Sequence, residues 1–290
     1  MSTRKIFYSQ VTLDSDWIGE QISRFLDEDR TGEDITTEGV IQQKCDAIAR
    51  IEAAQNLVFA GAQIVPAFFK EICEVDLQIS DGQRIVSGDL IGTITGPVKP
   101  ILNRERVMLN LVQHLSGIAT LTRAYVDQAA PHRVAILDTR KTLPGLRRFE
   151  KYAVAIGGGT NHRLDLFSGI LVKDNHLAVA RGVAAAVDNL RQKHPDRPIE
   201  VEVETEEQAL AGLGAGADAL LLDNMTAEEV RSCVKMIRSH PIGRDVFVEA
   251  SGGISLENVG AYAQTGIDGI SIGRLTHSAP AVDIRVELMA

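Results

Sequence analysis

Residues 216–223 read Gly-Ala-Asp-Ala-Leu-Leu-Leu-Asp, and residues 266–273 read Gly-Ile-Asp-Gly-Ile-Ser-Ile-Gly. Each stretch predicts the end of a helix, a tight turn and a short buried strand. The two stretches lie 50 residues apart along the chain. A β/α repeat of this kind favours a barrel of parallel strands, with a doubly wound open sheet as the alternative.

Similar short apolar runs, each followed by a polar cluster, recur between residues 133 and 274. They are residues 134–137, 170–172, 199–203, 219–222, 246–248 and 270–272. Helical segments separate them, and Thr226-x-x-Glu229 has the form of a capping box that opens a helix. Strands that alternate with helices imply parallel strands with right-handed crossovers. No GxGxxG follows the first run, which argues against the open dinucleotide-binding sheet.

Residues 1–104 have a mixed α+β pattern instead. Apolar side chains at helical spacing predict a first helix from Ser15 or Asp16 to about Leu26. Short strands are expected at residues 77–79, 84–86 and 90–94, with turns at 81–82, 87–89 and 96–97. These strands resemble the small sandwich of lipoyl and biotinyl carrier domains, but no lysine occupies a hairpin turn, which favours a packing domain. A long helix is expected from about residue 105 to 129, and Ser116-Gly117 favours a kink in it.

The composition is that of a globular protein with an acidic surface. The 290 residues include 30 Lys+Arg and 39 Asp+Glu, a net charge of −9, and 44% are hydrophobic. This length accommodates one barrel and a smaller domain. The acidic excess argues against a nucleic-acid footprint over the whole surface. No apolar run could span a membrane, residues 1–8 lack the apolar core of a signal peptide, and the three cysteines are far apart. We therefore expect a cytoplasmic protein with reduced thiols.

Barrel enzymes place their working residues at the carboxyl ends of the strands. That rule selects Arg140, Lys141, Lys173, Glu202, Asp223, Ser251-Gly252-Gly253 and Gly273. The late glycines are typical of loops whose backbone N–H groups bind phosphate, although an ordinary turn is the alternative. Residues 138–173 contain seven Lys or Arg but only three Asp or Glu. A cationic segment in an acidic protein predicts a small anionic substrate.

His162-Arg163 follows three glycines and is the histidine of most interest. The glycines suggest backbone packed around a ligand, whereas a lone histidine is often structural, and both interpretations stay open. No histidine spacing predicts a zinc site.

The stretch Asp138-Thr139-Arg140-Lys141-Thr142-Leu143-Pro144-Gly145-Leu146-Arg147 resembles the signature of the quinolinate phosphoribosyltransferases. Supporting stretches lie at residues 32–37, 105–110, 114–120, 157–163, 172–176, 222–225, 249–254 and 275–280. Leu143 departs from the small polar residue that is more common there, and it affects no charged position.

The resemblance implies a fold, a reaction and partners. The fold is an incomplete, about seven-stranded α/β barrel, residues 116–274, plus an N-terminal α+β sandwich domain, residues 1–115, joined by the C-terminal tail, residues 275–290. The reaction is phosphoribosyl transfer from phosphoribosyl pyrophosphate to quinolinate with decarboxylation, in NAD biosynthesis. It needs Mg2+ and occurs in a homodimer whose active site is shared between subunits. No nucleic acid or membrane takes part.

The resemblance also implies roles for individual residues. Quinolinate would be bound by Arg106, supplied by the dimer mate, and by Thr139, Arg140, Lys141, His162, Arg163 and Lys173. Phosphoribosyl pyrophosphate would be bound by Lys141, Lys173, Glu202, Asp223, Ser251, Gly252, Gly253, Ser271 and Gly273. Lys141, Glu202 and Asp223 would be catalytic, and the two acids would also hold Mg2+, directly or through ribose hydroxyls.

Three other functions remain open at this point. A lysine at a strand end, Lys173, also suits a Schiff-base aldolase. A homologous transferase could use a different substrate. A non-catalytic binding protein could use the same scaffold, although the combination of acids, cations and phosphate turns argues for an enzyme.

Overall fold

The computed structural model describes residues 10–180 and 182–289. The expectation for residues 1–8 lies outside this part of the chain. Within it, no helix is long and apolar enough to cross a membrane. The chain divides into two compact units, one built mainly from residues 124–147 and 159–277, the other from residues 12–123, 148–158 and 278–289.

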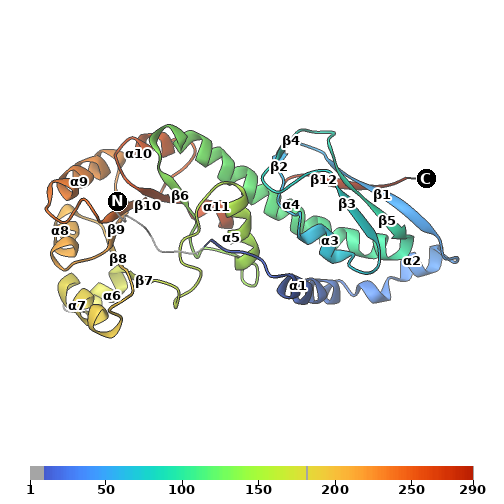
Figure 1. Ribbon diagram of the computed structural model, residues 1–290, viewed down its shortest axis with the longest axis horizontal. Coiled ribbons are helices and arrows are strands. Elements are labelled where there is room, and N and C mark those ends of the chain that lie inside the picture. Colours follow the sequence, from blue (N-terminus) through green and yellow to red (C-terminus); the bar gives the residue numbers. More distant parts are fainter. Residues whose placement is uncertain (1–9, 181, 290) are drawn as a thin grey trace. The chain divides into compact units, whose positions relative to one another are not determined.

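The first unit contains a parallel six-stranded sheet, visible in Figure 1. Its strands are β6 (Ala135–Leu137), β7 (Ile170–Val172), β8 (Ile199–Val203), β9 (Ala219–Asp223), β10 (Phe247–Ser251) and β11 (Gly269–Ser271). The spatial order is β6-β11-β10-β9-β8-β7, so the first strand pairs with the last. That pairing is typical of a barrel, and it excludes the doubly wound alternative, whose strand order reverses at an interior strand.

The sheet is not a closed ring of paired strands. β6 and β7 occupy its two ends, and Thr160 forms an isolated parallel bridge to Leu137 on β6. This six-stranded, barrel-like sheet confirms the incomplete α/β barrel that the family resemblance implies, where about seven strands were expected. All six predicted strands are confirmed to within two or three residues.

Helices follow each of the strands β7 to β11, as the alternation predicts. They are α6 (Asp174–Val179), α7 (Val183–Lys193), α8 (Glu206–Gly214), α9 (Ala227–Ser239), α10 (Val259–Ala263) and α11 (Arg274–His277). The predicted capping box is present at α9, because the Glu229 N–H donates to the Thr226 hydroxyl and the Glu229 carboxylate accepts from Thr226 N–H. Such a cap contributes about 1 kcal/mol to helix stability.

Apolar strand residues form the barrel core. Val201, Leu220, Leu222, Val248 and Ile270 are fully buried. Each buried aliphatic side chain contributes roughly 1.5–3 kcal/mol relative to exposure. This core fixes the strand ends on which the polar residues stand.

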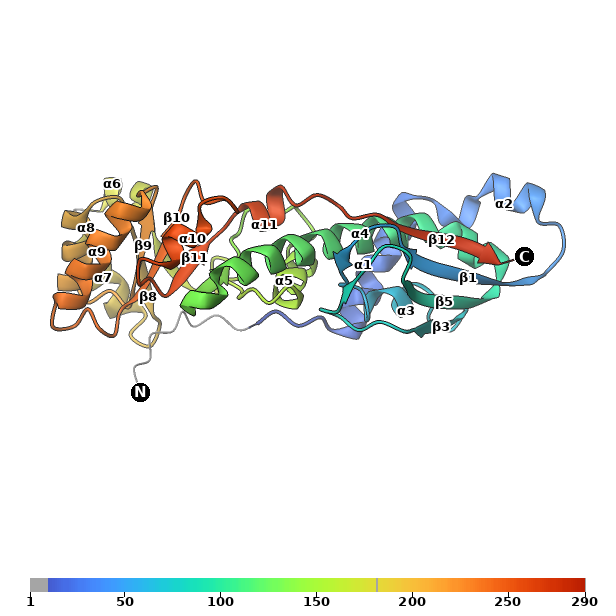
Figure 2. The ribbon, with the colours of Figure 1, turned by 90° about the horizontal axis from the view of Figure 1, so that it is seen from above.

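The second unit is α+β and is built around an antiparallel sheet, seen from above in Figure 2. Its strand order is β12-β1-β5-β3, from β1 (Asp46–Ala53), β3 (Glu74–Leu77), β5 (Leu90–Pro97) and β12 (Ile284–Met289). A small sheet pairs β2 (Leu57–Val58) with β4 (Arg84–Ile85). The helical elements of this unit are α1 (Ser15–Glu28), η1 (Thr31–Glu33), α2 (Ile35–Val40), α3 (Ile64–Phe68), most of α4 (Val98–Ala129) and α5 (Arg147–Ile156). The end of α4 and η2 (Ala130–His132) belong to the first unit. α4 runs through residues 115 and 116, so the domain limits set there stay a prediction.

Several expectations for the second unit are confirmed and others are wrong. The first helix begins at Ser15 after an Asp14 cap, as predicted. The strand expected at residues 77–79 instead occupies Glu74–Leu77, and residues 96–97 continue β5 rather than forming a turn. α4 is one continuous helix; a Cβ at Gly117 would collide with the Pro280 carbonyl. The glycine therefore permits close approach of the C-terminal segment, a function that helix periodicity does not reveal.

Candidate active site

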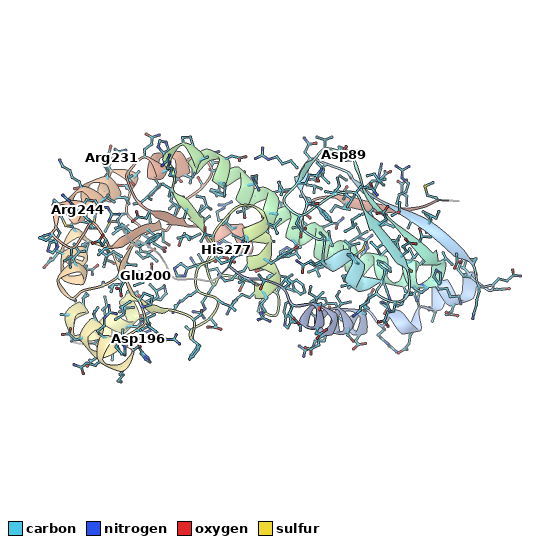
Figure 3. The ribbon with its side chains drawn as sticks, viewed as in Figure 1. Asp89, Asp196, Glu200, Arg231, Arg244 and His277 are labelled. Atoms are coloured by element: carbon cyan, nitrogen blue, oxygen red, sulfur yellow. The ribbon has the colours of Figure 1, made fainter. Side chains whose placement is uncertain are left out.

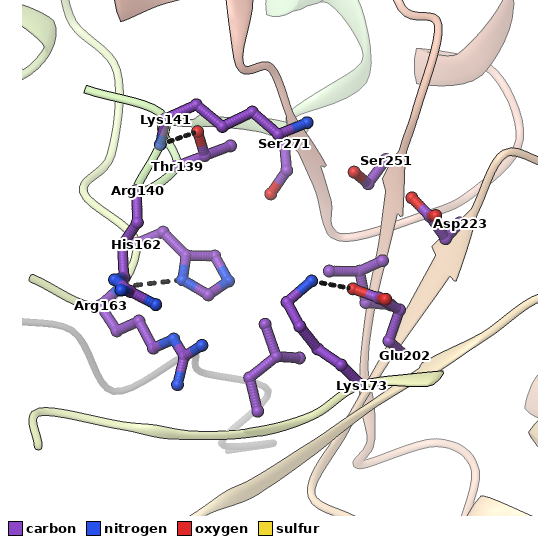
Figure 4. A pocket seen from close by; sticks show the side chains of 12 residues that line it. Thr139, Arg140, Lys141, His162, Arg163, Lys173, Glu202, Asp223, Ser251 and Ser271 are labelled. Atoms are coloured by element: carbon purple, nitrogen blue, oxygen red, sulfur yellow. Dashed lines mark hydrogen bonds and ion pairs between the residues drawn. The ribbon is translucent and has the colours of Figure 1, made fainter. Parts of the chain in front are cut away.

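A cavity of about 320 Å3 opens toward the carboxyl ends of the barrel strands (Figure 4). The side chains that line it are Thr139, Arg140, Lys141, His162, Arg163, Leu171, Lys173, Glu202, Leu221, Asp223, Ser251 and Ser271. All except the two leucines are site residues predicted from the sequence. The fold thus brings these residues together, while their individual roles stay predictions.

Cationic side chains cover one side of the cavity. Arg163 is only 6% exposed, and its Nη1 donates to the Gly169 carbonyl at 3.1 Å. Burial, and then the charge of Arg163, hold the pKa of Arg140 below its ordinary value. The Lys141 N–H donates to the Thr139 hydroxyl at 3.0 Å, which shapes the turn after β6. A negatively charged ligand would relieve the repulsion between these groups.

Asp138 fixes the segment that carries His162 and Arg163. It is fully buried, and its carboxylate accepts from the His162 N–H at 2.8 Å and from the Asn161 Nδ2 at 2.7 Å. The segment is therefore held against the end of β6. The sequence contained Asp138 in the signature stretch but gave no indication of this structural role.

Two acids stand on the opposite side, on neighbouring strands. The Glu202 Oε2 lies 2.6 Å from the Lys173 Nζ. Asp223 ends β9, and its Oδ2 accepts from the Asn224 Nδ2 at 2.7 Å. Mg2+ prefers oxygen ligands such as carboxylates, and both carboxylates line the cavity, so this pair fits that ion chemically.

A smaller cavity of about 180 Å3 surrounds the late glycine turns. It is lined by Lys141, Ser251, Gly252, Gly253, Ile254, Ser255, Ser271, Ile272, Gly273, Arg274 and His277. Gly252 has a φ of 94°, and a Cβ there would collide with the Asn224 Oδ1. Glycine is thus required at residue 252 on both counts. Arg274 and His277 were not predicted as site residues; a cation directly after Gly273 was the available signal.

Arg106 does not line either of these cavities. It lies on α4 and contributes, with Asp29, Arg30, Glu33 and Asp34 among others, to a cavity of about 520 Å3 in the second unit. Its expected role at the cationic cavity therefore stays a prediction.

A buried cluster of one imidazole and two carboxylates lies beside the cationic wall. The His162 Nε2 is 3.2 Å from the Glu200 Oε2 and 3.6 Å from the Glu249 Oε1. The three ligand atoms lie within 4.8 Å of one another, a spacing that a divalent cation could also use. The carboxylates oppose the effect of burial and raise the pKa of His162 to about 10. Glu200 lies in the predicted strand at residues 199–203 and Glu249 in the family stretch at residues 249–254, but the sequence pattern assigned a site role to neither.

Both parts of the chain match known family sequence models. The quinolinate phosphoribosyl transferase N-terminal domain matches residues 34–116, and the C-terminal domain of that family matches residues 118–287. The chain belongs to the quinolinate phosphoribosyltransferase family.

Relatives of this phosphoribosyltransferase share most of its length. It is 40% identical to the nicotinate-nucleotide pyrophosphorylase [carboxylating] of Mycobacterium leprae, over 93% of this chain and 96% of the relative. It is 42% identical to a probable nicotinate-nucleotide pyrophosphorylase of Bacillus subtilis, over 91% and 90%. The crystal structure of NadC from Streptococcus pyogenes matches with a TM-score of 0.90 at 37% identity, covering 96% of this chain and 98% of that one. The family resemblance inferred from the sequence is confirmed.

Proposed function

We propose that this phosphoribosyltransferase transfers the ribosyl phosphate of phosphoribosyl pyrophosphate to quinolinate, with loss of CO2, to form nicotinate mononucleotide for NAD biosynthesis. The supporting observation is one cavity that combines cations from several chain segments with two acids on adjacent strands. Its relatives are named for this chemistry. Such a cavity suits a dianionic acceptor and a phosphorylated sugar at the same time.

Quinolinate binding would use the cationic side. Arg140 and Arg163 offer planar forks that match carboxylates, and Lys141 and Lys173 add point charges. Arg163 is already fixed by its bond to the Gly169 carbonyl, so little ordering remains when the substrate binds. Fixed cations would hold the ring nitrogen in line with the reacting sugar carbon.

Phosphoribosyl pyrophosphate would lie along the acids and the glycine turns. Glu202 and Asp223 would accept from the ribose hydroxyls, and Ser251, Gly252, Gly253 and Gly273 would bind the 5-phosphate through the smaller cavity. Arg274 and His277 line that cavity as well and add positive charge where a phosphate would sit. Glu202 and Asp223 would also hold Mg2+, which when bound would neutralise charge that develops on pyrophosphate.

The protein would supply electrostatics and positioning rather than a nucleophile. Departure of pyrophosphate leaves positive charge on the sugar, which the nearby carboxylates of Glu202 and Asp223 stabilise. Attack by the ring nitrogen then makes that nitrogen cationic. The cationic ring stabilises the electron pair left on the adjacent carbon when its carboxylate departs as CO2. A proton on that carbon completes the product.

A cytoplasmic homodimer with a shared active site belongs to the same proposal. Arg106 does not line the cationic cavity, and the three cysteines are free thiols. We expect Arg106→Ala and Arg163→Ala to be inactive alone and to regain about a quarter of the wild-type activity per site when mixed, as random pairing of subunits requires. No recovery in mixed dimers would contradict the shared site.

The Schiff-base alternative is disfavoured by the geometry of Lys173. Its amino group is paired with the Glu202 carboxylate at 2.6 Å, so this ion pair would have to open before Lys173 could attack a carbonyl. Borohydride trapping with a carbonyl substrate would distinguish the two, because only an imine leaves a permanent adduct on Lys173.

The experiment that tests the proposed function is product analysis. Purified protein is incubated with phosphoribosyl pyrophosphate and Mg2+ plus either quinolinate or nicotinate. Formation of nicotinate mononucleotide with quinolinate but not with nicotinate supports the proposal. Formation only from nicotinate, or ligand binding with no product, would favour a transferase of different substrate or a binding protein.

A further inference from the structure

The two buried glutamates beside His162 stand one layer beneath the cavity. Side chains two residues apart on a strand point to the same face. Glu200 therefore shares its face of β8 with Glu202, and Glu249 shares its face of β10 with Ser251. Glu202 and Ser251 line the cavity, whereas Glu200 and Glu249 are 3% and 0% exposed. Figure 3 shows the Glu200 side chain among the barrel strands rather than on the outer helices.

Both nitrogens of the His162 ring are engaged within the protein. Nε2 faces the carboxylates of Glu200 and Glu249 at 3.2 and 3.6 Å. Nδ1 accepts from the Arg163 backbone N–H at 2.8 Å, a contact drawn in Figure 4. The ring consequently links the buried acids on one side to the segment of Arg163 on the other.

Glu249 is held in place by Ser271. The Ser271 hydroxyl donates to the Glu249 Oε1 at 2.7 Å, and this is the oxygen that faces His162. The other oxygen, Oε2, is buried without a hydrogen-bond partner. Burying a carboxylate at this position costs free energy, and an apolar side chain would pack there more easily. The fold nevertheless has an acid at this position.

From this geometry we propose that Glu249 is a positioning residue: with Glu200 it grips the His162 Nε2 from inside the barrel, and the ring in turn fixes Arg163 at the cavity wall. His162 then acts through Arg163 rather than by donating a hydrogen bond to the substrate. The substrate class is the anionic acceptor of the proposed function, and this part of the inference rests on that function. The link between Glu249 and His162 does not.

Two effects act in opposite directions on the protonation of the His162 ring. The charged groups that face His162 are Glu200 from β8 and Glu249 from β10, and Asp138 and Arg163 flank its backbone. The two carboxylates raise the pKa of the His162 ring, while the bond that Nδ1 accepts needs a lone pair there and favours the neutral ring. Nε2 carries a proton in either form. Burial, and then the charge of Glu200, raise the pKa of Glu249.

The test compares the wild type with Glu249→Gln, which preserves size but not charge. Ring-15N labelling gives signals from seven histidine rings, two nitrogens in each, and His162→Gln identifies the pair that belongs to His162. Without any substrate, we expect the His162 signal in Glu249→Gln to titrate at a pH about one unit or more below that of the wild type. This readout stands even if quinolinate proves not to be the substrate.

Kinetics supply the second readout. We expect Glu249→Gln to raise the KM for quinolinate about tenfold, with kcat little changed. Glu150→Gln is the matched control, because Glu150 is also fully buried and faces a histidine, His114, at 2.9 Å in the other unit. That variant should leave both the His162 signal and the KM unchanged.

Three results would overturn the inference. The first is a His162 titration in Glu249→Gln that matches the wild type. The second is a fall in kcat together with the rise in KM, accompanied by a fall in Tm equal to that of Glu150→Gln, which would indicate packing alone. The third is one tightly bound zinc or manganese ion per wild-type chain that disappears in Glu249→Gln, because a metal would then hold the three side chains together.

Discussion

The Lys173 Nζ lies 2.6 Å from the Glu202 Oε2, so a cation that follows β7 and an acid on β8 neutralise each other across adjacent strands. In the proposed reaction, Lys173 binds the negatively charged acceptor. Glu202 faces the ribose, on which positive charge develops. Substrate binding therefore requires that this ion pair open or be shared. Because the pair is partly exposed, its own contribution to folding is small.

Replacing Glu202 tests its role separately from that of Lys173. We expect Glu202→Gln to lower kcat by about two orders of magnitude, since a carboxylate that stabilises the developing sugar charge is lost. Steady-state kinetics with both substrates varied would measure this change. Unfolding by urea should give a midpoint near that of the wild type. A variant with normal kcat would contradict the role assigned to Glu202.

The cations of the cavity wall should be individually necessary. Arg140→Ala, Lys141→Ala and Arg163→Ala are each expected to reduce kcat/KM for quinolinate by roughly a hundredfold or more, because each removes a fixed charge from a dianion site. Circular dichroism should show folded proteins. Lys193→Ala, at the exposed end of α7, is the control and should retain wild-type kinetics. Near-normal kinetics in any of the three cavity variants would remove that residue from the site.

The glycine turn offers a steric test of phosphate binding. At Gly252 a φ of 94° and the adjacent Asn224 side chain leave no room for a Cβ, so Gly252→Ala should displace the turn. We expect the KM for phosphoribosyl pyrophosphate to rise about tenfold or more, with a smaller effect on the KM for quinolinate. Gly260→Ala, where a Cβ would meet nothing within 4 Å, should be neutral. Equal KM values for the Gly252→Ala variant and the wild type would argue that the turn does not bind phosphate.

The buried cluster should make stability depend on pH. The pKa of His162 is about 10 in the folded chain against an ordinary value of 6.5, so the folded state binds more protons than the unfolded state between these values. Its contribution to the free energy of unfolding is therefore complete below about pH 6.5 and is lost as the pH rises toward 10. Glu249, whose pKa is also raised, acts in the same direction.

Urea denaturation of the wild type and of His162→Gln at pH 6, 8 and 10 measures this effect. We expect the wild type to be more stable by the largest margin at pH 6 and by the smallest at pH 10. A margin that grows with pH would show that the ring is held neutral by the fold.

The sequence was sufficient for the barrel because each of its strands is a local signal. An apolar run such as residues 219–222 is followed by a polar residue, which marks the end of the strand. Because the connections between parallel strands are right-handed, few topologies remain possible. The residues at strand ends, including Lys173, Glu202 and Asp223, could then be placed at one edge without further information. Their presence in one cavity follows from that rule.

Long-range pairing was beyond the sequence. β1 lies between β5 and β12, and Ile51 pairs with Val286, more than two hundred residues away. Such a partner leaves no local signature, so neither strand was predicted. The same limit applies to Glu249, whose relation to His162 depends on the register of β10 across the barrel. Spacing along the chain identifies which residues share one face of a strand, but not which residues of other strands they contact.

Measuring the release of CO2 tests the proposed decarboxylating transfer to quinolinate most directly. The protein is supplied with quinolinate labelled in the 2-carboxylate, Mg2+ and phosphoribosyl pyrophosphate, and both trapped label and nicotinate mononucleotide are measured. We expect one labelled CO2 for each mononucleotide formed, and none without phosphoribosyl pyrophosphate. Mononucleotide without release of label, or no turnover of quinolinate by the folded wild-type protein, would contradict this expectation.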